Sequence, residues 1–435
     1  MDWWLASILL MLPVLLLLAM GMPIAFAMGT IGVVGLVLVG GPTQIYSVGT
    51  WTYGTVNNFI LIALPLFVFM AELMGTTGLT DAVYSALEKW LRRLPAGLGV
   101  ASIAGCAAFA AASGVSVACA AAMGRVAIPT MLDRGYDKKL ACGTIAAGGT
   151  LGILIPPSVP LILYASVSEE SIGRLFMAGF IPGFMMAAIF SVYLMGVAML
   201  RPGMIPRITE GVSWRERMVA LPTMLPLVLL VVAVLGSMYL GVATPTEAAA
   251  VGCVLVIAMA AIRGRLRFSA LRPALMSTVE TTSFILLIVA SIIVFGYLLG
   301  ILHIPQELSQ WVIGLGLSKW VVLWMIIGIY FILGMFIDPV SIILLSTPVF
   351  LPIIKALGFD PIWFGILLVL NLEVALITPP VGMNVYVIAG QVQRYGITMW
   401  DVFRGIAPFV VLLLIGMAII MVFPQIVLWL PNTMR

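Results

Sequence analysis

Charged side chains are scarce in this chain of 435 residues. Lys, Arg, Asp and Glu together make up 9% of it, whereas hydrophobic residues make up 63%, and the mean hydropathy is +1.21. Soluble domains carry about 25% charged residues. The composition therefore excludes an ordinary water-soluble fold, and it predicts helices of about 20 apolar residues that cross a lipid bilayer.

Histidine and cysteine are also rare. The one histidine, His303, and four cysteines without metal-ligand or paired spacing do not suit a metal-dependent enzyme or a disulfide framework. The sequence contains no phosphate-binding loop of the form GxxxxGK[ST], which an ATP-driven pump would need. We expect no cofactor, no catalytic residue and no nucleic-acid partner. An ion gradient remains as the source of energy.

Apolar segments are distributed along the whole chain. Ten of them predict membrane spans, at 4–20, 22–40, 58–78, 141–165, 175–200, 219–239, 244–262, 280–301, 363–388 and 405–428. Two further stretches, 97–132 and 319–355, are interrupted by polar or helix-breaking residues. Irregular backbone is tolerated at membrane depth only where protein or water satisfies it, so we interpret both stretches as re-entrant hairpins whose tips face an internal site.

The basic residues predict an orientation in the membrane. If the N-terminus is outside, every Lys and Arg except Arg174, Lys319, Lys355 and Arg435 lies on the cytoplasmic side. This arrangement follows the positive-inside rule. Both termini are then periplasmic, the hairpin 97–132 enters from the cytoplasm, and the hairpin 319–355 enters from the periplasm.

The chain contains an internal repeat. The segment "VAIPTMLDRGYDKKLACGTIAAGGTLGILIPPS" from Val126 aligns without gaps to "VFLPIIKALGFDPIWFGILLVLNLEVALITPPV" from Val349. An odd number of crossings separates the copies, so they run in opposite directions. The prediction is an all-α polytopic membrane protein with two inverted repeats, 1–212 and 213–435, and with ion and substrate sites near the midplane.

Each repeat supplies a hairpin tip and a helix interrupted by a pair of prolines. The discontinuous helices are 141–165 and 363–388, because paired prolines remove amide donors and break a regular helix. Unpaired carbonyls at such a break can bind a cation, and helix N-termini favour an anion. Two tips and two breaks therefore predict two cation sites that flank one substrate site.

Several segments resemble the large membrane (M) subunit of the tripartite ATP-independent periplasmic (TRAP) transporters. They are "IALPLFVFMAELM", "SGVSVACAAAMG", "GTLGILIPPS", "AGFIPG", "GVATPTEAAA" and "ITPPVGMNVYV", in that order. The resemblance implies sodium-coupled import of small organic anions, such as sialic acid, dicarboxylates or oxo-acids, by an elevator mechanism in the bacterial inner membrane. It also implies two partners, a small four-helix membrane subunit and a periplasmic substrate-binding protein.

The resemblance assigns site residues as well. Sodium, the only metal expected, would bind at a first site made of Ser113, Gly114, Val115, Ser116, Gly152, Ile155 and Pro157. The second sodium site would comprise Ile337, Asp338, Ala375, Thr378 and Pro380, and the substrate region Ser116, Ser158, Pro339, Ser341 and Gly382. The family's first tip usually reads Ser-Gly-Ser-Ser, so Val115 removes one side-chain ligand and leaves only its carbonyl.

Two roles remain open for the polar residues at membrane depth. Asp338 is either a cation ligand or an N-cap that precedes Pro339 at the first helical position. Asn371 and Glu373 either support the second break by hydrogen bonds or bind a proton. Glu247 has the spacing of a capping box with Thr244.

Two other functions are consistent with parts of the sequence. The first is a stand-alone symporter of divalent anions and sodium that needs no binding protein. The second is an intramembrane hydrolase in which Asp338 and Glu373 act as paired carboxylates, although neither HExxH nor a Ser/His pair at depth is present.

Overall fold

The structure is a computed structural model that describes residues 2–206 and 212–434. Every regular element in these two ranges is helical, as predicted. The boundary proposed between the two repeats is at 212, directly after the segment 207–211. Arg207, one of the basic residues assigned to the cytoplasmic side, lies outside the described residues.

The helices of the first half include both elements of the first hairpin and both parts of the first broken helix. They are α1 (Trp3–Ala19), α2 (Ile24–Gly40), α3 (Gln44–Val56), α4 (Phe59–Thr76), α5 (Leu79–Leu91), α6 (Gly97–Ser113), α7 (Ser116–Asp133), α8 (Lys138–Leu154), α9 (Val159–Ser168) and α10 (Ile172–Leu200).

The second half contains the corresponding elements and a short C-terminal helix. They are α11 (Trp214–Tyr239), α12 (Pro245–Ile262), α13 (Phe268–Ile301), α14 (Ile304–Gly314), α15 (Lys319–Gly334), α16 (Pro339–Ala356), α17 (Pro361–Leu376), α18 (Met383–Val392), the 3-10 turn η1 (Gln393–Tyr395), α19 (Met399–Val422) and α20 (Gln425–Asn432).

Helix ends recur in the register of the sequence repeat. In this register, the first and last residues of α16 correspond to the first and last residues of α7. Asp137 caps α8 by accepting hydrogen bonds from two backbone N–H groups, both at 3.0 Å. Asp360 caps α17 in the same way, at 2.8 and 3.1 Å. Gly135 and Gly358, both with φ 77°, provide the left-handed residue that precedes each cap.

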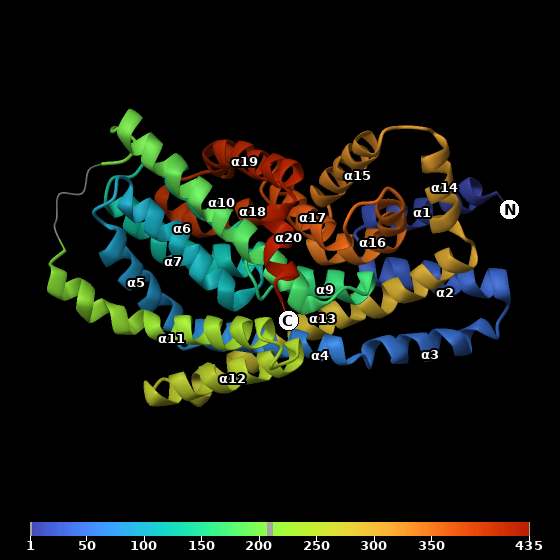
Figure 1. Ribbon diagram of the computed structural model, residues 1–435, viewed down its shortest axis with the longest axis horizontal. Coiled ribbons are helices and arrows are strands. Elements are labelled where there is room, and N and C mark those ends of the chain that lie inside the picture. Colours follow the sequence, from blue (N-terminus) through green and yellow to red (C-terminus); the bar gives the residue numbers. More distant parts are fainter. Residues whose placement is uncertain (1, 207–211, 435) are drawn as a thin grey trace.

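The helices form two groups (Figure 1). In the first group, which we call the scaffold layer, α13 packs along α2, α3 and α4, and α12 contacts both α4 and α11. The second group, the hairpin layer, contains α6–α10 and α15–α20. Its centre is α8, which contacts α6, α7, α10 and α19.

Burial agrees with this division. The apolar window within 138–168, which covers α8 and α9, is 89% buried inside the chain, whereas the window in α11 is 22% buried. The first broken helix is therefore enclosed by protein, and α11 presents most of its surface to lipid or to another chain.

Eight helical segments of the described chain are long and apolar enough to cross a membrane. The predicted span 280–301 is the second part of one of these segments, α13, which begins at Phe268. Residues 44–56, outside every predicted span, form the helix α3, which is not among the eight segments. A helix of 34 residues is about 50 Å long, so α13 extends well beyond a hydrocarbon core of about 30 Å.

Close packing of α8 against α19 generates a stability prediction. A Cβ on Gly405 would overlap with the carbonyl oxygen of Lys139, which belongs to the backbone and cannot rotate away. Gly405→Ala should therefore separate the two helices and destabilise the protein by about 1–3 kcal/mol. Thermal unfolding of the purified protein measures this effect.

The matched control is Gly196→Ala on α10, where a Cβ meets no atom within 4 Å. It should leave the melting temperature unchanged or raise it slightly, since alanine is the better helix former. Equal melting temperatures for the two variants would contradict the close contact between α8 and α19.

Candidate functional site

The first hairpin turns within two residues. α6 ends at Ser113, Gly114 adopts a left-handed conformation with φ 63°, Val115 is extended, and α7 begins at Ser116. Ser113 and Ser116 are thus the last and first residues of the two arms. The irregular tip is shorter than the predicted segment 113–116, and Gly114 provides the positive φ that the turn requires.

The first tip lies directly against the first broken helix. A Cβ on Gly114 would be 2.6 Å from the carbonyl oxygen of Pro157, and a Cβ on Gly152 would be 2.9 Å from that of Val115. The backbone N–H of Val159 donates a hydrogen bond of 3.2 Å to the carbonyl oxygen of Gly114. The structure therefore brings the predicted tip residues together with Gly152 and Pro157 through their main chains.

The side chains of this region have different roles. Ser158, predicted in the substrate region, caps α9: its hydroxyl donates to the carbonyl oxygen of Ile153 at 2.5 Å and accepts from the backbone N–H of Leu161. The side chain of Ile155 packs against Gly183 of α10. Ser113 is 4% exposed, and its hydroxyl has no hydrogen-bond partner among the described residues.

The second break is more open than the first. Residues 155–158 are buried, whereas Pro379, Pro380 and Val381 are exposed. The Thr378 hydroxyl donates to the carbonyl oxygen of Val374 at 2.5 Å and so remains within its own helix. The hairpin arm α15 reaches α17 at Ala375, because a Cβ on Gly334 would be 2.6 Å from the Ala375 Cβ.

The second tip spans residues 335–338, so Pro339 and Ser341 lie inside α16. Asp338 is the N-cap: one carboxylate oxygen accepts from the backbone N–H of Ser341 at 3.0 Å, and the other accepts from its hydroxyl at 2.5 Å. The capping role of Asp338 is confirmed, and its role as a cation ligand stays a prediction. The capping box of Thr244 and Glu247 is confirmed as well.

The sequence interpretation missed Asn384, the second residue of α18. It is fully buried, and its amide nitrogen donates to the Ser116 hydroxyl at 2.8 Å and to the carbonyl oxygen of Ala146 at 3.2 Å. The signal in the sequence is an amide side chain in the first turn of an apolar helix, directly after the second break. Its partner could not be inferred, because Ser116 is 268 residues away.

The two polar residues of α17 behave differently from each other. The Asn371 amide donates to the carbonyl oxygen of Ile327 on α15 at 3.0 Å, as expected for a supporting residue. Glu373 is fully buried, yet neither carboxylate oxygen has a hydrogen-bond partner among the described residues. The hydrogen-bonded support expected from Glu373 is therefore missing in the described part of the chain.

A partly polar cavity of about 510 Å³ adjoins the first tip. It lies between α4 and α13 of the scaffold layer and the hairpin helices α6 and α7. Its polar side chains are those of Glu72, Thr76, Ser113, Arg125 and Thr281. The unpartnered Ser113 hydroxyl thus lines a space that also contains a carboxylate and a guanidinium group.

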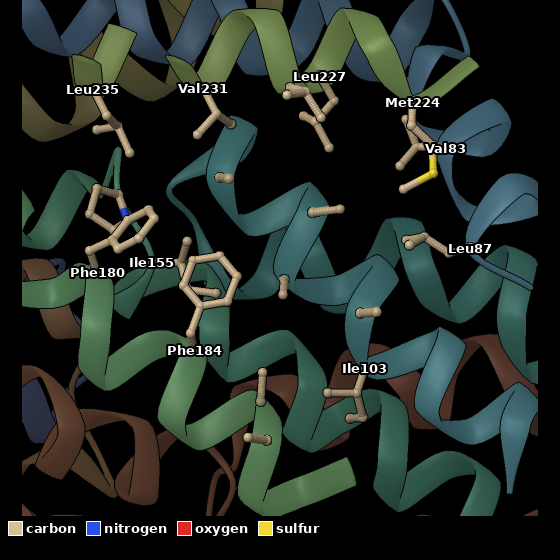
Figure 2. A pocket seen from close by; sticks show the side chains of 18 of the residues that line it. Val83, Leu87, Ile103, Ile155, Phe180, Phe184, Met224, Leu227, Val231 and Leu235 are labelled. Carbon is tan, nitrogen blue, oxygen red and sulfur yellow. The ribbon is translucent and has the colours of Figure 1, made fainter. Parts of the chain in front are cut away.

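A second cavity, of about 500 Å³, lies behind the first break and is almost entirely apolar (Figure 2). Leu227, Val231 and Leu235 of α11 line one side, and Phe180 and Phe184 of α10 lie opposite them. Ile155 forms part of the wall. The cavity therefore separates the scaffold helix α11 from the hairpin layer.

The contact between Gly114 and Pro157 generates a second prediction. Gly114→Ala combines a left-handed backbone, which costs about 1–2 kcal/mol for a residue with a Cβ, with a clash against the carbonyl oxygen of Pro157. Gly358→Ala carries the same backbone cost, because φ is 77°, but its Cβ meets no atom within 4 Å. Gly114→Ala should lower the melting temperature clearly more than Gly358→Ala. Equal losses would show that the tip does not depend on its contact with the break.

Comparisons with known proteins identify the family. The profile described as "Tripartite ATP-independent periplasmic transporter, DctM component" matches residues 11–426. The large permease protein of a C4-dicarboxylate TRAP transporter from Pseudomonas aeruginosa is 36% identical over 91% of this chain and 92% of its own length. The corresponding sialic acid permease of Vibrio cholerae is 33% identical over 96% of both chains. That of an ectoine transporter from Halomonas elongata is 31% identical over 95% of this chain and 96% of its own length.

Solved structures agree on the fold. The YdaH transporter of Alcanivorax borkumensis superimposes with a TM-score of 0.65 at 14% identity and covers 89% of each chain. MtrF of Neisseria gonorrhoeae superimposes with a TM-score of 0.58, also at 14% identity, over 91% of this chain and 85% of the MtrF chain.

The curated relatives are permeases rather than enzymes, which excludes the intramembrane hydrolase. The chain is a multi-pass membrane protein, and it belongs to the TRAP transporter family as a large permease of the DctM type.

Proposed function

We propose that this permease imports small organic anions together with sodium ions, by an elevator movement of the hairpin layer against the scaffold layer. The observation that carries the proposal is the arrangement at the first tip. There Gly114 and Gly152 bring the main chains of the tip and the broken helix close together, and the buried hydroxyl of the adjacent Ser113 has no hydrogen-bond partner among the described residues. Oxygen atoms of this kind suit a hard monovalent cation.

The first sodium site would use the hydroxyls of Ser113 and Ser116. Main-chain oxygens of the tip and the break, at Gly114, Val115, Gly152, Ile155 and Pro157, would complete it. The contacts of Gly114 with Pro157 and of Gly152 with Val115 support this assignment, since they hold the two segments at main-chain distance. A sodium ion would stabilise the tip by binding the Ser113 hydroxyl, which has no partner among the described residues, together with the remaining lone pairs of these carbonyl oxygens.

The second sodium site would use Asp338 together with the carbonyl oxygens of Ile337, Ala375 and Pro380 and the hydroxyl of Thr378. An ionised carboxylate offers about four lone-pair sites, and capping occupies two at Asp338. The remaining sites are available to a cation. The exposure of the second break supports a site that exchanges ions more freely than the first.

The substrate would bind between these sites, near Ser116, Ser158, Pro339, Ser341 and Gly382. The cavity that contains Arg125 adjoins the same tip and offers a cationic group for a carboxylate. The names of the relatives include C4-dicarboxylate, sialic acid and ectoine, which carry a carboxylate, and isethionate, which carries a sulfonate. These names support a small organic solute with a carboxylate or sulfonate group as the proposed substrate class.

The elevator movement is supported by one part of the boundary between the two layers, where α10 faces α11. The cavity between α11 and α10 is lined by apolar side chains that offer no directional bonds to a sliding neighbour. Within the hairpin layer, by contrast, hydrogen bonds from side-chain amides join neighbouring helices, as Asn371 does between α17 and α15. One layer can then move as a unit relative to the other.

The proposed partners and orientation follow those of the family. A periplasmic binding protein would deliver the substrate, and a small four-helix membrane subunit would cover part of the exposed scaffold helices, among which α11 has the lowest burial of the candidate spans. The protein would lie in the bacterial inner membrane as two inverted repeats, with both hairpins re-entrant and both termini in the periplasm.

Sodium dependence is tested with Ser113→Ala and Asp338→Ala in proteoliposomes that contain the permease and its two partners. Loss of one hydroxyl ligand should raise the sodium concentration for half-maximal uptake about five-fold, equivalent to about 1 kcal/mol, and Asp338→Ala should raise it further. Ser102→Ala is the control, since its hydroxyl is satisfied within α6 by the carbonyl oxygen of Leu98. Unchanged sodium dependence in both test variants would remove these residues from the ion sites.

The same vesicles test the need for a binding protein. Succinate, sialic acid and ectoine are offered with and without the periplasmic fraction, under an inward sodium gradient. Uptake only in the presence of the binding protein supports the proposal. Uptake by the permease alone would instead identify a stand-alone symporter.

Recognition of the carboxylate is tested with Arg125→Gln. Removing a charged hydrogen-bond donor should raise the KM for the transported anion by roughly ten-fold or more, because such bonds contribute about 1.5–3 kcal/mol. Arg93→Gln is the control: Arg93 lies before α6 and lines a different cavity. An equal KM for the two variants would exclude Arg125 from the substrate path.

A further inference from the structure

Asn384 joins the second broken helix to the first hairpin tip. It belongs to the first turn of α18, two residues after Gly382, so the path of the second break sets its position. Its side chain crosses to the other half of the chain and reaches Ser116, the first residue of α7, and Ala146 on α8. No other hydrogen bond given above connects a tip of one half with a break of the other.

The Asn384 side-chain amide is fully buried, and both its nitrogen and its oxygen form hydrogen bonds. Burying an amide without hydrogen bonds costs several kcal/mol in an apolar environment, so these contacts strongly favour one orientation of the side chain. The Ser116 hydroxyl donates to Oδ1 at 3.2 Å and accepts from Nδ2 at 2.8 Å. Since a hydroxyl has one proton and two lone pairs, one lone pair of Ser116 remains for a further ligand.

The repeat contains no symmetric counterpart of this link. When the gap-free alignment of the two copies is extended, Ser116 corresponds to Pro339 and Asn384 to Leu161. Neither of these side chains donates or accepts a hydrogen bond. At these positions the second tip and the first break therefore lack an equivalent connection, and among the described residues this polar link joins the second break to the first tip.

We propose that Asn384 is a positioning residue that couples the two cation sites. A cation at the second break fixes the start of α18, and Asn384 then holds the Ser116 hydroxyl with its free lone pair toward the first site. Because coupling between two sites is reciprocal, sodium at either site strengthens binding at the other. This role rests on the proposed sodium coupling, and it adds the physical connection that makes two sites act together.

The experiment measures equilibrium binding of radioactive sodium to the purified full-length permease, with choline chloride to keep the ionic strength constant. Asn384→Leu removes the amide at nearly constant volume. Gln391→Leu is the matched control, because Gln391 also lies on α18 and donates to α7, at the carbonyl oxygen of Ala121 at 2.9 Å, but away from the tip. Ser116→Ala and the double variant with Asn384→Leu complete a thermodynamic cycle.

Asn384→Leu should raise the sodium concentration at half-saturation about five-fold, the effect of one lost hydrogen bond, and lower the Hill coefficient toward one. Gln391→Leu should change neither quantity. In the Ser116→Ala background, Asn384→Leu should have no further effect, because its action passes through the serine hydroxyl. If the Asn384→Leu protein cannot be produced in folded form, Asn384→Ala replaces it in the same thermodynamic cycle.

Three results would overturn the coupling role. In the first, Asn384→Leu has a lower melting temperature in choline chloride but binds sodium like the wild type. In the second, Gln391→Leu raises the sodium concentration at half-saturation as much as Asn384→Leu does. In the third, the effects of Asn384→Leu and Ser116→Ala on sodium binding are additive. A different result addresses the proposed function itself: if the wild-type protein shows no saturable sodium binding, sodium coupling is wrong and the role of Asn384 falls with it.

Discussion

The structure depends on how main-chain polar groups are satisfied where helices break inside a membrane protein. An unpaired carbonyl or amide in hydrocarbon costs several kcal/mol, so a break is stable only if another segment or an ion replaces the lost partners. The first break meets this requirement by packing against a hairpin tip: the backbone N–H of Val159 bonds to Gly114, and two glycines allow main chains to approach closely. Ser113 and Ser116 flank this backbone contact, so it positions both hydroxyls next to the first break.

The two halves share their backbone plan but differ in their polar side chains. Both tips place an extended residue before the second arm, yet that residue is Val115 in one half and Asp338 in the other. The first break is buried and the second is partly exposed. Val115 and Asp338 are both partly buried, so the charge at the second tip does not follow from a difference in exposure between the two tips. The repeat therefore accounts for two breaks, and sequence divergence makes them chemically different.

Local signals in the sequence predicted most of the helix breaks, but they predicted few of the tertiary contacts between the broken segments. Paired prolines, Gly114 and the capping residues Asp137 and Asp360 act within a few residues, so hairpins and broken helices were found within a few residues of their true ends. The bond between Asn384 and Ser116 depends on tertiary packing across 268 residues, which no local pattern contains. The difference in exposure between the two breaks was equally hidden, because the aligned segments are similar in sequence and the burial of each is set by its neighbours.

Polar and apolar contacts have complementary roles in the arrangement of the layers. Buried amides join helices inside the hairpin layer: Asn384 ties α18 to α7 and α8, and Asn371 ties α17 to α15. Directional bonds of this kind hold a group of broken helices as one body, although the breaks deprive it of continuous helical hydrogen bonding. The cavity between α10 and α11 contains almost no polar surface, and the hydroxyl of Tyr239, at the end of α11, donates a hydrogen bond of 3.2 Å to the Thr433 hydroxyl, directly after α20. In the proposed elevator movement, the polar bonds inside the hairpin layer would keep the binding site together, whereas the bond between Tyr239 and Thr433 would have to break.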